Sequence, residues 1–394
     1  MMIKRFGSLL VALACVATLA ACEGPAGPAG TAGADGAQGP AGPQGPAGPA
    51  GPTGPAGQDA NENCTQCHVS DVTLFAKQLQ YAVSIHRTGE HLYNSGSCGS
   101  CHSHQGFLER VTTDAYGVVS PIADPVYINC RTCHQIHTTY TDADYAFTAT
   151  TPFALYNEDF ATGTRQTADY GAAAGNLCAR CHQARPLRER VGGGIDSLPQ
   201  LGGPDVRISS TRYGFHYGTQ GQVIAGSGAY EFTGSMTVNG GPTSHGNVAT
   251  NAKMCATCHM ALATDIELGG HTWNVALHAN GSTEENVAGC NLSGCHNGGI
   301  VDFTSLGNVP GQILPLLMRL DTLLVDKGIK QLYSPGYTIH DLEYYANTGT
   351  YNATLATAMA NWAMFAWDRS LGLHNPAYAR SVLTNTIEAV QALP

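Results

Sequence analysis

The sequence predicts a mostly irregular fold with a few α-helices, three of them C-terminal, behind an N-terminal collagen-like segment. Gly, Ser, Thr and Asn punctuate residues 58–310, which leaves little room there for long regular elements. Apolar residues recur at helical spacing over 311–327, 353–371 and 376–392, and in one shorter stretch, 74–84. These observations predict that something other than a continuous apolar core organises residues 58–310.

Composition narrows the classes of function before any motif is considered. The chain has 394 residues, a formal net charge of −10 and only 12% charged residues. This negative balance disfavours nucleic acid as a partner, because binding phosphates requires a basic face. No apolar run of membrane-spanning length follows the N-terminus. Fourteen cysteines beside 16 histidines instead predict metal or haem binding.

The N-terminus has the pattern of an export signal over residues 1–21. Lys4 and Arg5 precede an apolar run that is too short to cross a bilayer. The run closes as LAAC, ending at Cys22, which resembles the bacterial lipobox whose cysteine is lipidated. Glu23 favours the outer membrane, by resemblance to bacterial lipoproteins. We therefore expect an exported outer-membrane lipoprotein, held by lipid at Cys22 and placed at the cell surface; the alternative is an ordinary signal with Cys22 incidental.

Residues 22–57 are predicted to form a stalk. From Gly24 to Gly57 every third residue is glycine, in twelve triplets, and eight of the 20 prolines lie there. Only glycine fits at the axis of three polyproline II chains, so this period predicts a collagen-like triple helix. A single-chain spacer that never trimerises is the alternative. In either case, 34 residues at a rise of ~3.1 Å would span roughly 100 Å.

The motif C-x-x-C-H occurs five times after the stalk, and a sixth copy has four residues between its cysteines. Two thiols one turn apart can add to the two vinyl groups of one haem, and the adjacent histidine then faces the iron. The twelve motif cysteines are every cysteine after Cys22. The attachment cysteines and proximal histidines are Cys64, Cys67 and His68; Cys98, Cys101 and His102; Cys130, Cys133 and His134; Cys178, Cys181 and His182; Cys255, Cys258 and His259; and Cys290, Cys295 and His296.

Other uses of paired cysteines do not require this pattern. Zinc ribbons use C-x-x-C pairs but do not place a histidine after each second cysteine. A redox dithiol uses one such pair, and structural disulfides impose no histidine register. The predicted cofactor is therefore haem c, six groups attached covalently. Residues 58–310 are predicted to form the multihaem cytochrome domain, and 311–394 a helical part that completes it.

Ten further histidines are available for the second axial position of six irons. A second imidazole makes an iron six-coordinate and closed to substrate, which suits electron transfer. Sequence context favours as distal ligands His86, His137, His216, His245, His271 and His374. The reserves are His91, His278 and His340, whereas His104 lies too close in sequence to its own haem, as do Met254 and Met260. Spacing alone leaves open which histidine serves which iron.

Several stretches resemble the extracellular multihaem c-type cytochromes of metal-reducing bacteria, some of which polymerise into filaments. They are CHSHQGFLERV, NLCARCHQAR, FHYGTQGQVIAGSGAYEF, CATCHM, GGHTWNV and LGLHNPAYA. The last also resembles the C-terminal haem-ligand segment of pentahaem nitrite reductases. The resemblance covers roughly residues 60–390, and it implies the same six distal histidines. The collagen-like stalk, the lipobox and the expanded sixth motif depart from it, and the first two favour a surface-tethered protein over a free filament.

The sequence thus predicts an electron-transfer protein rather than an enzyme. Six haems would lie too close to be insulated by the protein around them, so electrons would pass between the cell envelope and extracellular acceptors or partner cytochromes. One alternative is a multihaem reductase of nitrogen or sulfur oxyanions, suggested by the HNP segment, although such an enzyme needs an open iron. Another is a haem-bearing filament subunit, with self-association through the filament or the collagen trimer.

Overall fold

The computed structural model describes residues 72–89, 91–114, 121–158, 165–184, 187, 199–279, 282–305, 307–331 and 345–394. The chain divides into two compact units, Met1–Ala56 and Gly57–Pro394, and every described residue belongs to the second. The predicted signal, Cys22, the stalk, the first motif and His340 lie outside the described residues. Within the described ranges, no helix combines the length and apolar character needed to cross a bilayer.

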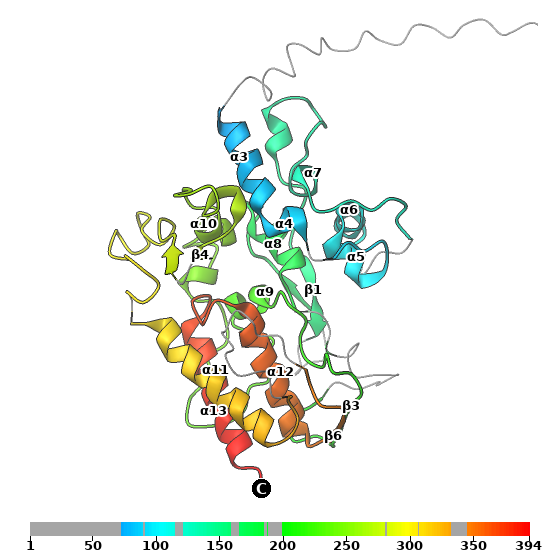
Figure 1. Ribbon diagram of the computed structural model, residues 1–394, viewed down its shortest axis with the longest axis vertical. Helices are drawn as coiled ribbons and strands as arrows, with labels where there is room; N and C mark the ends of the chain where they lie inside the picture. The colour runs from blue at the N-terminus through cyan, green and yellow to red at the C-terminus, as the bar shows by residue number, and fades with distance from the viewer. Residues whose placement is uncertain are drawn as a thin grey trace, which may run out of the picture. The chain divides into compact units, whose positions relative to one another are not determined.

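The part of the chain that carries the motifs has short helices joined by irregular segments (Figure 1). Its α-helices are α3 Val72–Val83, α4 Ile85–Thr88, α5 Gly96–His102, α6 His104–Thr113, α7 Cys130–Cys133, α8 Gly175–Cys181, α9 Gln220–Ala225 and α10 Cys255–His259. Single 3₁₀ turns cover η1 Asp142–Tyr145, η3 Ser244–Gly246 and η4 Gly270–Thr272. Left-handed residues end some of them, such as Asp114 after α6, with a φ of 51°. The described fold is therefore mostly irregular, with helices as its main regular elements.

Strands are few and form small antiparallel pairs. They are β1 Phe153–Glu158 with β2 Arg165–Ala168, β3 Val206–Ile208 with β6 Gly349–Tyr351, and β4 Ala276–Ala279 with β5 Ser282–Glu285. The β3–β6 pair joins segments on either side of the last motifs, with Arg207 opposite Thr350. This ties the C-terminal part to the motif-bearing part.

Three longer helices pack together in the C-terminal part, α11 Val309–Asp326, α12 Ala353–Asp368 and α13 Pro376–Gln391. Asparagine side chains cap all three N-termini, each accepting a hydrogen bond from a backbone N–H of the first turn. Burial of α12 is almost complete, and Trp362 at its centre donates from Nε1 to the Leu317 carbonyl at 3.2 Å. These helices form the main apolar core of the described chain.

Two buried asparagines fasten an extended segment to these helices. Asn361 accepts from the Tyr230 N–H and donates to the Tyr230 carbonyl, both at 2.7 Å. Asn385 donates to the carbonyls of Phe232 and Met236, both at 2.8 Å. Because these amides replace a neighbouring strand for the segment, they fix its path without a sheet. The segment lies between His216 and His245 in the chain.

Candidate functional site

Helical turns carry four of the described motifs. α5, α7, α8 and α10 each hold both cysteines of one motif three positions apart, which puts the two thiols on one face of the turn. In α7, Asn129 and Thr132 form a reciprocal capping box that fixes the turn. The sixth motif forms a wider turn, closed by the His296 N–H donating to the Cys290 carbonyl at 3.1 Å. None of the ten described cysteines is joined to another in a disulfide.

Each described motif histidine lies beside a histidine from a distant part of the chain. The ring centroids of the five pairs are 6.0 to 6.4 Å apart. The pairs are His102 with His216, His134 with His271, His182 with His86, His259 with His374, and His296 with His245. Within the described ranges, no group of three or more His, Cys, Asp or Glu is arranged to hold a metal ion by itself. The imidazoles of the described motif histidines are therefore arranged in pairs.

This separation matches two imidazoles that share one metal. An imidazole nitrogen lies about 2 Å from a metal that it binds, and about 1 Å from its own ring centroid, so two rings on opposite sides of one metal have centroids about 6 Å apart. The two thiols on one face of the turn would supply the two thioether bonds of a c-type haem. The described donor sets therefore fit an iron porphyrin held by two thioethers and two imidazoles.

Backbone carbonyls fix the tautomer of several paired rings. A carbonyl oxygen only accepts hydrogen bonds, so the ring nitrogen Nδ1 that faces it carries the proton and Nε2 keeps a lone pair for a metal. These bonds run from His134 to Tyr145, from His259 to Trp273 and from His245 to Leu373, at 2.7, 2.9 and 2.8 Å. His182 Nδ1 lies 3.3 Å from Oε1 of Gln220. These contacts orient the rings as metal ligands are usually oriented.

Burial favours the neutral form of five of the ten paired rings. Desolvation, with a smaller contribution from neighbouring histidines, lowers the pKa of His86, His259 and His271 to about 4 in each case. The same burial lowers the pKa of His134 and His182. His86 Nδ1 is buried and makes no hydrogen bond. Neutral imidazole is the form that binds a metal, so these rings are ready to ligate at neutral pH.

His374 is held differently, by a carboxylate. Asp368 Oδ1 lies 2.6 Å from His374 Nδ1, and the Asp368 side chain is 1% exposed. Burial lowers the pKa of His374, but the attraction and hydrogen bond of Asp368 outweigh it and raise that pKa above its ordinary value. Ser370 donates from Oγ to Oδ2 of the same aspartate. A buried negative charge therefore sits directly behind this ring.

Sulfur atoms of different motifs touch one another. Cys101 lies against Cys181, Cys178 against Cys255, and Cys258 against Cys290, close enough for the side chains to interact. These contacts join the second motif to the fourth, the fourth to the fifth and the fifth to the sixth. Gly289 makes the last junction possible, since a Cβ there would lie 2.3 Å from the Thr257 carbonyl oxygen. The motifs thus follow a spatial order that differs from their order in sequence.

Trp273 contacts ligands of three different pairs. Its ring lies 4.5 Å from His86 and 5.6 Å from His271, measured between centroids, and its carbonyl accepts from His259 Nδ1 at 2.9 Å. Its backbone is left-handed, with a φ of 59°. The third, fourth and fifth motifs therefore converge at this residue.

Other predicted site residues lie elsewhere. His137 is exposed and stacks on Tyr140 with centroids 5.6 Å apart. His91 packs against Tyr93, whose ring also lies 5.5 Å from His102. The ring of His104 bonds the Thr132 hydroxyl, and that of His278 bonds the Thr283 hydroxyl. Sequence reasoning missed Trp273, Gln220 and Asp368, because no spacing rule ties them to the rings they hold.

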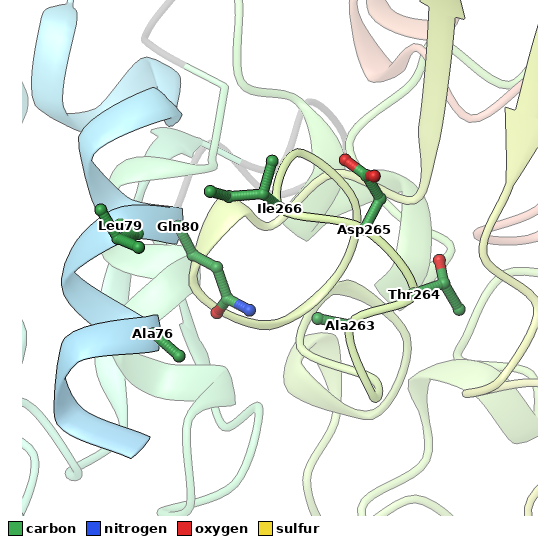
Figure 2. Close-up of a pocket in the computed structure, with 7 residues that line it drawn as sticks. All are labelled: Ala76, Leu79, Gln80, Ala263, Thr264, Asp265 and Ile266. Carbon is green, nitrogen blue, oxygen red and sulfur yellow. The ribbon is translucent and has the colours of Figure 1, made fainter. Parts of the chain in front are cut away.

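A small cavity of about 270 Å³ lies between α3 and the loop of residues 263–266. Figure 2 shows Ala76, Leu79 and Gln80 on the helix facing Ala263 and Ile266 on the loop. No paired histidine lines it, but Gln80 Oε1 accepts from the backbone N–H of His271 at 2.9 Å. The cavity is thus adjacent to the third pair of rings without being part of it.

Comparisons with known proteins give one structural likeness. No protein-family model matches the chain, and no curated protein matches it. Among solved structures, the chain is similar to one described as the crystal structure of the outer cell wall cytochrome OcwA, with a TM-score of 0.43 and 16% sequence identity. The match covers 80% of this chain and 50% of that one, so the chain spans about half the length of that protein.

Proposed function

We propose that the protein is a hexahaem c-type cytochrome that transfers electrons along closely spaced haems. The observation that carries this proposal is the set of five imidazole pairs, each joining a C-x-x-C-H or expanded motif histidine to a remote histidine at the spacing of a shared metal. When bound there, an iron porphyrin supplies reversible one-electron chemistry. Two imidazoles on each iron leave no position for substrate, which favours electron transfer over catalysis.

The sulfur contacts support a route through the protein. The electron path would run from the second site to the fourth, fifth and sixth, because their attachment cysteines touch in that order. The third site would join at the fourth, since Cys133 and Cys181 pack against one apolar cluster around Leu177 and Trp273 contacts ligands of both sites. The fourth site is then the junction of the path.

The first site would take His137 as its distal ligand. His68 lies four residues before the start of α3, and four extended residues reach at most about 14 Å. The segment that carries His137 packs against this helix, because Lys77 of α3 lies 5.8 Å from the ring centroid of Tyr145, eight residues after His137. The other five histidines that sequence context favours each lie beside a described motif ring. These points favour His137 for the first site.

The setting of this path would be the cell envelope. The signal, Cys22 and the collagen-like segment support an exported outer-membrane lipoprotein whose haem domain stands away from the surface on a stalk. Partner cytochromes and extracellular electron acceptors are the partners that this placement suits. Trimerisation through the stalk would bring three such paths together.

Two measurements on the haem-loaded protein test the proposal. Native mass spectrometry should show six covalent haem additions, and the absorption spectrum should be that of low-spin iron throughout. The variant His271→Ala should make about one sixth of the iron high-spin, whereas His278→Ala, which changes an exposed histidine of β4, should leave the spectrum unchanged. Fewer than six additions, or high-spin iron in the unchanged protein with turnover of nitrite or hydroxylamine, would contradict it.

A further inference from the structure

The paired rings differ in the charge that faces Nδ1. For His134, His245 and His259 the acceptor is a neutral backbone carbonyl, and for His182 it is a neutral amide oxygen. For His374 it is the carboxylate of Asp368, whose side chain is 1% exposed. Gln220 also holds the backbone of this residue, since its Nε2 donates to the backbone carbonyl of Asp368 at 3.3 Å. Among these five described Nδ1 contacts, the one to His374 is the contact that involves a buried carboxylate.

The carboxylate should favour the oxidised metal at the fifth site. A ring nitrogen that donates to a carboxylate gives up more electron density through its other nitrogen, which makes the imidazole a stronger ligand. A buried negative charge also acts through a low dielectric, so it stabilises the more positive oxidation state more than an exposed charge would. Both effects lower the reduction potential of an iron bound to His374.

The second site has a buried charge of the opposite sign. Arg110 is 1% exposed, and its Nη1 donates to Cys101 Sγ at 3.4 Å. Its guanidinium also stacks on Tyr156, 4.2 Å from the ring centroid. Arg180, which is 2% exposed, lies in the same region but is paired with Asp114 at 2.9 Å. A buried cation beside an attachment sulfur stabilises the state with one more electron, which raises the reduction potential there.

We propose that Asp368 and Arg110 grade the electron path, making the fifth site the most reducing of the five paired sites and the second site more oxidising. The inference rests on the proposed function. Internal transfer then runs from the fifth site through the fourth to the second. Each step takes one electron from one site and gives it to the next, and no bond or proton changes place.

Redox titration of the haem-loaded protein tests this grading. Absorption and electron paramagnetic resonance should be followed in the unchanged chain and in Asp368→Asn, Arg110→Gln and Glu388→Gln. Asp368→Asn should raise the lowest of the potentials by a tenfold change in the reduction equilibrium, about 59 mV for one electron. Arg110→Gln should lower a different, higher potential. Glu388→Gln removes a carboxylate of α13 that bonds Ser235 and should shift none.

A separate variant keeps the test decisive if Asp368→Asn does not assemble. Ser370→Ala removes the hydroxyl that donates to Asp368 Oδ2, so the carboxylate acts more strongly on His374 and the lowest potential should fall further. Haem number and spin state, measured on the same samples, report on the proposed function independently. Six low-spin haems with unshifted potentials in the assembled variants would overturn the grading and leave the electron-transfer proposal standing. Failure to find six haems would overturn the proposed function first.

Discussion

The motif-bearing part and the C-terminal helices are stabilised in different ways. Around α11, α12 and α13, buried aliphatic and aromatic side chains form one large cluster, which also takes in earlier residues such as Phe215 and Tyr230. Before residue 305 there are two further clusters, of six and three buried side chains. All but one of the exposed large apolar side chains also lie there, including Phe75 at 61%, Ile85 at 63% and Leu262 at 81% exposure. The C-terminal part has an ordinary core, whereas the motif-bearing part needs its cofactors to complete one.

Withholding haem should separate the two parts, and this is the largest effect we expect. In the full chain made without haem attachment, α11, α12 and α13 should keep slow amide hydrogen exchange, because no motif cysteine or histidine belongs to their apolar cluster. The motif helices, of four to seven residues where they carry cysteines, should exchange as unfolded chain, since helices that short are unstable alone. Hydrogen exchange read by mass spectrometry checks both segments in one sample.

The haem-loaded chain is the control for this comparison. There both parts should be protected, and the difference between the two samples should be confined to residues that precede α11 and to the turn between α12 and α13 that carries His374. Equal protection of the motif segments with and without haem would show that the protein alone folds them.

The residues that the sequence could and could not predict follow the same division. Apolar spacing predicts helices over 311–327, 353–371 and 376–392, and the structure has helices within a few residues of these ranges, because local periodicity encodes a helix face. The attachment motifs are equally local. The pairing of rings is not: His86 precedes the second motif but lies beside His182 of the fourth.

Long-range packing decided what spacing left open. His271 precedes the sixth motif in the chain, yet it lies beside His134 of the third, because Gln80 of α3 holds its backbone. From the sequence, Asp368 is only the polar last residue of a buried helix. In the structure, the turn after that helix brings Nδ1 of His374 within hydrogen-bond distance of the Asp368 carboxylate. Contacts of this kind depend on the path of the whole chain, so a local sequence motif does not predict them.

A substitution in the apolar core should destabilise the C-terminal helices without affecting the haem sites. Trp362→Ala removes the large buried ring of α12, its hydrogen bond to the Leu317 carbonyl and its contact with Lys330, so it should destabilise the C-terminal helices by about 3–5 kcal/mol. The haem absorption spectrum without denaturant should not change. Guanidinium unfolding followed by circular dichroism measures the first effect.

Met318→Ala is the matched substitution on the neighbouring helix α11. Its side chain is 62% exposed, so truncating it should change the stability by no more than about 0.5 kcal/mol. If Trp362→Ala were as mild as Met318→Ala, or if it disturbed the low-spin spectrum, the C-terminal core would not be independent of the haems.

The smallest effect concerns pH and a surface bond that joins the two parts. Glu388 of α13 accepts from the Ser235 N–H at 2.8 Å and from the Ser235 hydroxyl, and these bonds lower the pKa of its carboxyl. Because that pKa is lower in the folded than in the unfolded chain, the carboxylate stabilises the fold above the unfolded value of about 4.3 and loses this effect as pH falls through the folded value.

Glu388→Gln should therefore lower the melting temperature slightly at pH 7, and the difference from the unchanged chain should shrink as the pH approaches the lowered pKa. Differential scanning calorimetry at pH 7, 5 and 4 measures it, with Glu284→Gln in the exposed strand β5 as the control that should show no such trend. A difference in melting temperature that stays constant with pH would mean that the stabilisation by the Ser235 bonds does not depend on the charge of Glu388. The fastening of the 229–236 segment would then rest on Asn361 and Asn385, whose amides do not titrate.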